Sequence, residues 1–100
     1  MSKTVFIGQP MNGRTEKEIM AERGAMIRRA WDKFGKDIVV LDTFFNDFDP
    51  AAKPLDYLAK SIKFLAKADV AIFAPGWQNA RGCRIEHQCA VDYDIPVMEV

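Results

Sequence analysis

The sequence predicts an α/β fold, a small doubly wound sandwich in which a four-stranded, mainly parallel sheet carries helices on both faces. Short, almost wholly apolar runs recur along the chain and are typical of strands that are covered on both faces. Longer segments with apolar residues at helical spacing separate these runs. Strands and helices that alternate in this way form right-handed βαβ units, and such units build a parallel sheet.

The first half of the chain opens with a strand and continues with the longest expected helix. Thr4–Gly8 is apolar and ends in glycine, and the turn-forming residues Gln9–Arg14 follow it. Thr15 and Glu18 have the spacing of a capping box, which predicts the start of a helix. Gly35 is expected to end this helix. The residues that recur at helical spacing before it are Ile19, Met20, Arg23, Met26, Ile27, Ala30, Trp31 and Phe34.

A second strand and a second helix come next. Ile38–Leu41 is an apolar run and predicts a strand, whereas Thr43–Pro54 has too many turn residues to be regular and is expected to be an ordered loop over the sheet edge. Pro54 is well placed at the first position of a helix that runs to about Lys67. The inward residues of this helix are expected to be Leu55, Leu58, Ile62, Leu65 and Ala66.

The last part of the chain reads as strand, loop, helix and strand. Asp69–Ala74 is an apolar run, and Pro75 and Gly76 stop it. Trp77–Gly82 is a polar loop with one large aromatic residue. The spacing then predicts a helix over Cys83–Tyr93, with Ile85, Cys89 and Ala90 on one side, and a final strand over Ile95–Val100.

Composition limits the functions that this chain can have. Its 100 residues predict a single domain, residues 1–100, and 49% hydrophobic with 28% charged residues is an ordinary globular balance. Lys plus Arg equals Asp plus Glu at 14 each, so there is no electrostatic case for binding a nucleic-acid polymer. No apolar run approaches the roughly 20 residues of a membrane span, and no signal peptide is evident, so we expect a cytoplasmic protein without membrane partners. Cys83 and Cys89 lie on different faces of one expected helix and should stay free thiols.

The loops after the first and third strands are expected to form the binding crevice. If these strands are neighbours, as in a flavodoxin-like or Rossmann-like sheet, the topological switch point lies between them. Glycines at positions 8, 13, 76 and 82 would let the backbone approach a ligand, and the helix that begins near Cys83 would offer N–H groups to a phosphate or carboxylate. Trp77 could stack on a base, and Arg14 or Arg81 could form a fork with an anion. Neither loop is a P-loop or a GxGxxG fingerprint, so no motif supports ATP or NAD chemistry.

Two stretches of the chain carry a resemblance to a known family. GQPMNGR near the N-terminus and ADVAIFAPGWQNARGCRIEHQCA near the C-terminus resemble the nucleoside 2-deoxyribosyltransferase-like superfamily, especially its small branch with a GW-x-x-x-RG-x-x-x-E signature. Members cleave the bond between a base and deoxyribose, among them deoxynucleoside 5′-monophosphate N-glycosidases. The resemblance implies that Glu86 is the nucleophile, that the protein forms homodimers or larger homo-oligomers, and that it needs no metal or other cofactor.

The sequence departs from that family at three positions. An aspartate that usually precedes the third strand falls on Ser61, the phosphate-binding serine of the glycine loop falls on Ala80, and an early tyrosine falls at about Val5, which leaves Phe6 as the nearest aromatic residue. Asp56 or Asp69 could substitute for the missing carboxylate, although neither is well placed for it. These departures put turnover in question more than they question the fold.

The expected function is N-glycosidic bond cleavage or base exchange on a 2′-deoxynucleoside or its 5′-monophosphate. The start of the last helix, together with Arg81 or Arg84, is expected to keep Glu86 ionised. The candidate substrate-binding residues are Gly8, Gln9, Pro10, Met11, Arg14, Gly76, Trp77, Asn79, Arg81 and Gly82.

Other interpretations of the same residues stay open. The protein could be a non-catalytic nucleotide sensor or sponge, or an interaction module in which only the fold survives. Glu86, in the expected first turn of its helix, could merely complement the helix dipole. His87 is expected to be a surface or interface residue, and Cys83 a packed small residue rather than a reactive thiol.

Overall fold

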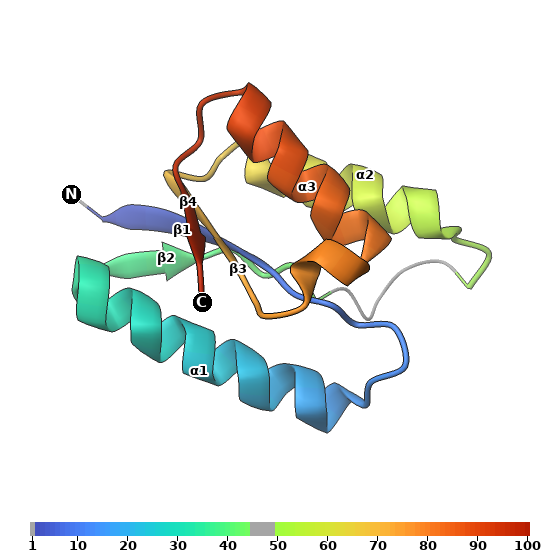
Figure 1. The fold of residues 1–100 in the computed structure, drawn as a ribbon, viewed down its shortest axis with the longest axis horizontal. Coiled ribbons are helices and arrows are strands. Elements are labelled where there is room, and N and C mark those ends of the chain that lie inside the picture. The colour runs from blue at the N-terminus through green and yellow to red at the C-terminus, as the bar shows by residue number, and fades with distance from the viewer. Residues whose placement is uncertain (1, 45–49) are drawn as a thin grey trace.

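The computed structural model describes residues 2–44 and 50–100, and it shows a four-stranded sheet between helical layers (Figure 1). This confirms the expected α/β class. The elements in chain order are β1 (Lys3–Gly8), α1 (Glu16–Phe34), β2 (Ile38–Val40), α2 (Pro54–Leu65), β3 (Val70–Phe73), the 3₁₀ turn η1 (Trp77–Asn79), α3 (Arg81–Asp92) and β4 (Val97–Glu99).

The strands are ordered β2-β1-β3-β4, and every pair is parallel. This is the flavodoxin-like order, so the first and third strands are the neighbours that the crevice requires. Their register pairs Val5 with Val70 and Gly8 with Phe73. Because the two strands end side by side, the loops that follow them leave the sheet at one point.

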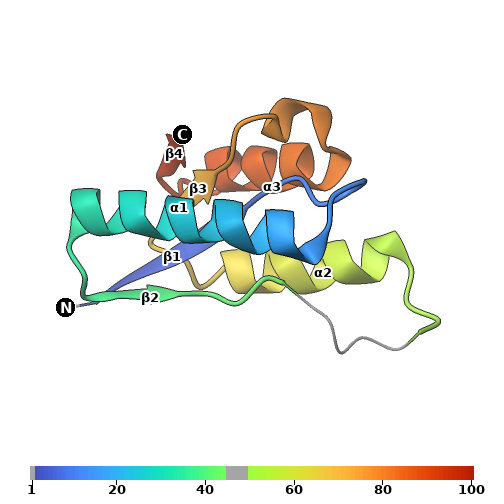
Figure 2. The ribbon, with the colours of Figure 1, turned by 90° about the horizontal axis from the view of Figure 1, so that it is seen from below.

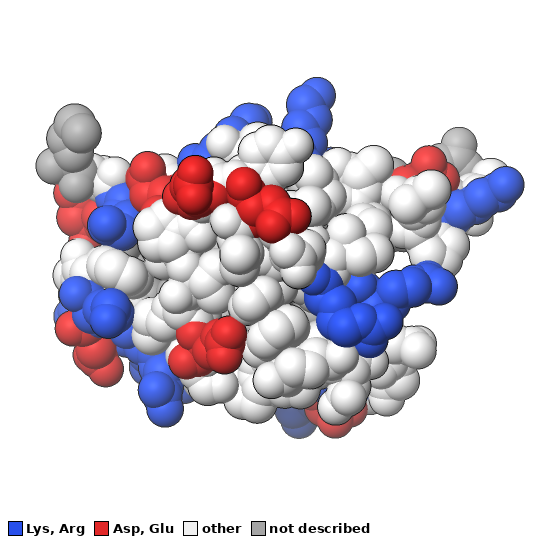
Figure 3. Space-filling view, turned by 45° about the horizontal axis from the view of Figure 1, so that its top comes forward, with Lys and Arg blue, Asp and Glu red and all other residues white. Residues whose placement is uncertain are grey.

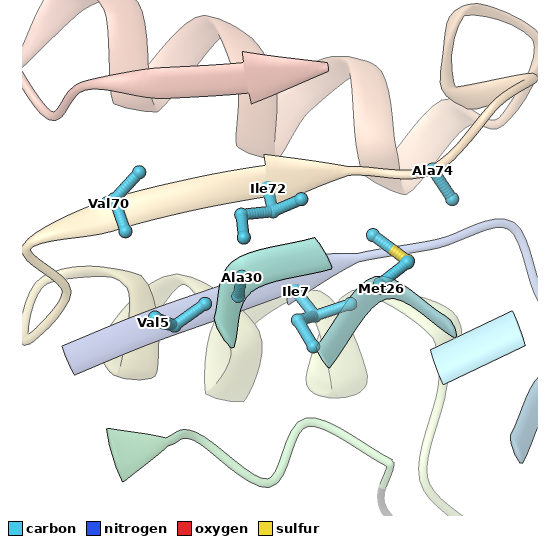
Figure 4. Close-up of a cluster of buried hydrophobic side chains, with 7 residues drawn as sticks. All are labelled: Val5, Ile7, Met26, Ala30, Val70, Ile72 and Ala74. Carbon is cyan, nitrogen blue, oxygen red and sulfur yellow. The ribbon is translucent and has the colours of Figure 1, made fainter. Parts of the chain in front are cut away.

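Each face of the sheet has its own apolar core. On one face, side chains of β1 and β3 pack against Met26 and Ala30 of α1 (Figure 4). On the other face, Phe6 and Phe73 pack against Leu65 of α2 and Ala90 of α3. Figures 1 and 2 show α1 on one side of the sheet and both α2 and α3 on the other. Alternate residues of β1 and β3 therefore serve opposite cores, as expected of strands buried on both faces.

Helix α1 has the ends that the sequence predicts. The Glu18 amide donates to Thr15 Oγ1, and the Thr15 amide donates to Glu18 Oε1, each at 3.1 Å, which completes the capping box. Gly35 follows the last turn with φ of +87°, a conformation that favours glycine, and its amide donates to the Trp31 carbonyl.

Three expectations about faces and boundaries are wrong. Leu55, near the start of α2, is 72% exposed, and Ala66, which follows the last residue of α2, is also exposed. Ile85 is 40% exposed, and the buried stripe of α3 is instead Cys83, Glu86 and Ala90. Both helices contain apolar residues on two adjacent faces, so spacing alone did not fix which face turns inward.

Some element limits also differ from expectation. The loop after β3 contains the short 3₁₀ turn η1, and α3 begins at Arg81 rather than Cys83. Strand β4 is shorter than expected. Part of the expected loop between β2 and α2, residues 45–49, lies outside the described residues. Within the described ranges, no helix is long and apolar enough to cross a membrane.

Candidate functional site

The two glycine-bearing loops meet at the carboxyl ends of β1 and β3. The Ala74 amide donates to the Gly8 carbonyl at 2.9 Å, and a Cβ placed on Gly76 would lie 4.0 Å from Pro10 Cγ. Gly76 has φ of +86°, so the loop turns there through a conformation that favours glycine. Residues far apart in the sequence thus form one edge, as the crevice prediction requires.

Glu86 reaches this edge from α3. A Cβ placed on Gly8 would lie 3.4 Å from Glu86 Oε1, and Glu86 is only 8% exposed. Burial raises the pKa of Glu86 to about 7, and a hydrogen bond with the Ser61 side chain acts in the opposite direction. The carboxyl group is therefore poised between its neutral and charged forms near neutral pH.

The expectation that Glu86 is held ionised by its helix and by arginines is wrong. Because α3 begins at Arg81, Glu86 lies in the second turn, beyond the reach of the helix dipole. Arg81 is exposed, and Arg84 Nη1 donates to the Gln78 carbonyl at 3.1 Å. No described Lys or Arg forms an ion pair with Glu86, so desolvation dominates its pKa.

Ser61 stands beside Glu86 on α2. It is 8% exposed, and its hydroxyl is the side-chain group that hydrogen-bonds the carboxyl. The carboxylates that could have replaced the missing aspartate are engaged elsewhere: Asp56 accepts the Lys53 amide at 2.7 Å, and Asp69 accepts the Thr4 amide at 2.8 Å. Ser61 is thus the polar neighbour that the fold supplies to Glu86.

Gln9 and Arg14 lie in the loop after β1 but are held by α1. Gln9 Nε2 donates to the Ile19 carbonyl at 3.1 Å and to Glu22 Oε1 at 3.0 Å. Arg14 Nη1 donates to Glu22 Oε1 and to the Pro10 carbonyl, both at 2.8 Å. These contacts shape the loop, and they already occupy donor groups that were expected to face a ligand.

A buried arginine that the site prediction missed supports the same loop. Arg23 is 5% exposed, and its guanidinium donates to Thr43 Oγ1 at 3.1 Å, to the Leu41 carbonyl at 2.5 Å and to Gln9 Oε1 at 3.5 Å. Burial lowers its pKa. The signal in the sequence was an arginine at an inward position of α1, where a charge must find polar partners.

Trp77 packs against other aromatic residues instead of standing alone over the crevice. Its ring stacks on His87 with centroids 3.8 Å apart and planes 7° apart, and it lies 5.9 Å from the Phe73 ring. His87 is not a plain surface residue, because its side chain is 17% exposed and its Nε2 donates to Glu99 Oε2 at 3.0 Å. One face of Trp77 is therefore already covered.

The remaining candidates lie around the rim of this edge. Met11 is half-buried and accepts the Arg14 amide at 3.2 Å, while Asn79 is exposed at the end of η1. A Cβ on Gly82 would meet nothing within 4 Å, so the start of α3 has open space above it. Arg81 and Arg84 are exposed. Figure 3 shows one face of the molecule, on which a group of Lys and Arg side chains lies beside a largely uncharged surface.

Two other features do not belong to this edge. Cys83 is buried, and burial raises the pKa of its thiol to about 12, so it is a packed residue as expected and not an activated one. A shallow hollow of about 260 Å³ lies against α1 and β4, lined by Arg29, Asp32, Lys33 and Met98, and contains none of the predicted site residues.

Comparison with known proteins gives one family. The sequence model of a family described as a domain of unknown function (DUF4406) matches residues 3–99, which is nearly the whole chain. None of the curated proteins matches the chain.

Proposed function

The chain belongs to the DUF4406 family, whose function is unknown, and we propose that it cleaves the N-glycosidic bond of a 2′-deoxynucleoside or its 5′-monophosphate, with Glu86 as the nucleophile. One observation carries the proposal: a carboxyl group is buried, without a described cation partner, at the edge where Gly8 and the two loops meet. Burying such a group destabilises the folded state, so its position calls for a functional reason. The resemblance to the nucleoside 2-deoxyribosyltransferase-like superfamily supplies the reaction.

The reaction follows from a carboxylate close to the anomeric carbon of a sugar. A Glu86 oxygen bonds to that carbon while the carbon–nitrogen bond breaks, and the electron pair leaves with the base, which takes a proton from solvent. Water then adds to the same carbon and releases Glu86 and the free sugar. A second base in place of water gives base exchange.

The other residues of the edge would have supporting roles in this reaction. Ser61 would orient the Glu86 carboxyl, and Gly8 leaves space beside it that a side chain would fill. The loop residues Pro10, Met11, Gly76 and Asn79 would seat base and sugar. Arg81 and the open start of α3 at Gly82 would hold a phosphate, because exposed cations and free N–H groups there favour an anion.

A product assay tests this proposal. The protein is incubated with each deoxynucleoside and each 5′-monophosphate, and free base is measured by chromatography. We expect Glu86→Gln to lower base release at least about 100-fold, because it keeps the shape of the side chain but removes the nucleophile. Asp92→Asn, at the far end of the same helix, should keep wild-type activity. Base release by Glu86→Gln at the wild-type rate would contradict the proposal.

The pH profile distinguishes a nucleophile from a proton donor. A nucleophilic Glu86 must be charged, so kcat/KM should rise as pH passes through the pKa of about 7 that burial gives it. If Glu86 instead protonated the leaving base, kcat/KM would fall over the same range.

A second candidate is a nucleotide-binding protein without turnover. It is favoured by Ser61 and Ala80, neutral residues at the positions where the resemblance places an aspartate and a phosphate-binding serine. Calorimetry with the same nucleotides separates the candidates. Binding in the absence of any base release would select the second one.

A further inference from the structure

A second cluster of side chains adjoins the Glu86 edge and has no role in the proposed reaction. It consists of Phe73 at the end of β3, Trp77 in η1, His87 in α3 and Glu99 in β4, and it is called the aromatic clamp below. The His87 ring lies 3.8 Å from Trp77 and 5.0 Å from Phe73 between centroids, and its Nε2 donates to Glu99 Oε2 at 3.0 Å. Residues of three other elements therefore converge on one imidazole ring of α3.

We propose that His87 and Glu99 are positioning residues, which hold Trp77 and thereby fix the Pro75–Ala80 loop at the substrate edge. This inference rests on the proposed function. His87 directly follows Glu86 in α3, so a loop that is anchored to His87 keeps its position relative to the nucleophile. Substrate-binding groups on that loop are then pre-placed, which lowers the entropic cost of binding.

Phe73 links the aromatic clamp to the site physically. It is fully buried, and its ring atoms would lie 2.6 and 2.7 Å from a Cβ on Gly8, while the same ring contacts both Trp77 and His87. One face of the clamp thus rests on the residue that also bounds the space beside Glu86. A shift of Trp77 would reach Gly8 through this buried ring, because protein interiors are close-packed.

The solvent exposure of the contact between His87 and Glu99 distinguishes a role in positioning Trp77 from a role in global stability. The Glu99 side chain is 52% exposed, so its contact with His87 is open to solvent on one side, and contacts of this kind contribute little to global stability. Their removal should loosen the loop more than it destabilises the fold. The imidazole has both properties that the clamp uses: a flat face that stacks on Trp77 and an N–H that reaches Glu99.

The test uses Trp77 as its own reporter. The chain has two tryptophans, so Trp31→Phe leaves Trp77 as the only one. In that background we expect His87→Ala to increase the quenching of Trp77 fluorescence by acrylamide. We also expect it to raise KM for the cleaved deoxynucleotide about 10- to 100-fold with kcat nearly unchanged, because Glu86 and Ser61 are not altered.

Further variants show which property of His87 and Glu99 holds Trp77. His87→Phe keeps the stack but loses the bond to Glu99, so it should fall between wild type and His87→Ala. Glu99→Gln keeps an acceptor for the His87 N–H and should rescue most of what Glu99→Ala loses. Gln88→Ala, an exposed neighbour in the same helix, is the matched control and should leave both quenching and KM unchanged.

The outcomes separate this inference from the proposed function. If the wild-type protein cleaves no deoxynucleotide, whether or not it binds one, the proposed function fails, and a positioning role in it fails as well. If it does cleave one, but His87→Ala leaves either Trp77 quenching or KM at the wild-type value, only the positioning role is overturned.

Discussion

A single buried carboxyl group distinguishes this chain at the scale of residues. Glu86 is turned toward Gly8 and Ser61, in the inward stripe of α3 where an apolar residue would be more stable. Ile85, its apolar neighbour in the sequence, is the one that is exposed. Helix α3 thus turns Glu86 rather than Ile85 toward the sheet. This burial costs folding free energy, and the cost grows as the Glu86 carboxyl group ionises.

Stability should therefore fall as pH rises. The pKa of Glu86 is raised from 4.5 to about 7 in the folded protein, so between these pH values the folded state binds a proton that the unfolded state has lost. The stability gained from this proton is complete below pH 4.5 and is lost as pH rises through 7. Between pH 5 and pH 8, we expect the free energy of unfolding of the wild-type protein to drop by about 2–3 kcal/mol more than that of Glu86→Gln. Urea titrations at both pH values measure the difference.

The control for that measurement is an exposed carboxylate. Glu16→Gln at the start of α1 keeps the buried Glu86 and should follow the wild-type pH dependence. Parallel pH dependences for wild type and Glu86→Gln would show that the carboxyl is solvated in the folded state, contrary to the burial described above.

At the scale of elements, the site depends on how closely β1, β3 and α3 approach one another. Gly8 ends β1 and pairs with Phe73, the last residue of β3. The Phe73 ring lies over the Gly8 Cα, and Glu86 of α3 lies just beyond, so a side chain at position 8 has no room. This glycine is required for close approach and not for its backbone angles.

Gly8→Ala should destabilise the protein by about 1–3 kcal/mol, because its Cβ would be 2.6 Å from a Phe73 ring that is fully buried. Thermal or denaturant unfolding measures this. Gly82→Ala is the matched control: its Cβ would meet nothing within 4 Å, and alanine is a better helix former, so stability should be unchanged or slightly higher. Equal stability of the two variants would mean that β1 and Phe73 are further apart than described.

At the scale of the whole molecule, the order β2-β1-β3-β4 divides the sheet into a centre and two edges. Strands β1 and β3 have a neighbour on both sides and an apolar core on both faces. Strands β2 and β4 each pair on one side only among the described residues. The site is built at the ends of the two central strands, which are the most constrained part of the fold.

Hydrogen exchange followed by NMR should show this division. Strands β1 and β3 have a partner strand on both sides, so the amides of Val5, Ile7 and Ile72 should be among the slowest to exchange. Those of β2 and β4 should exchange faster, because only alternate amides face a partner. Protection in β4 that equals that in β1 would indicate a partner on its outer edge.

The sequence by itself determined the elements and their order. Apolar runs such as Asp69–Ala74, the capping box of Thr15 and Glu18, and the turn at Gly76 are local signals, and local signals determine which segments form strands and helices. They also placed Glu86 on the helix after the third strand. These features could be predicted because each depends on residues close together in the chain.

Only the tertiary structure decided what surrounds those residues. Helices α2 and α3 pack on one face of the sheet, and this packing decides that Glu86 rather than Ile85 is buried. It also places the Ser61 hydroxyl beside the carboxyl group and raises the pKa of Glu86. The stack of Trp77 on His87 also joins two elements. Desolvation and aromatic contact are set by neighbours distant in sequence, so a helical pattern names the candidate residues but does not give their surroundings.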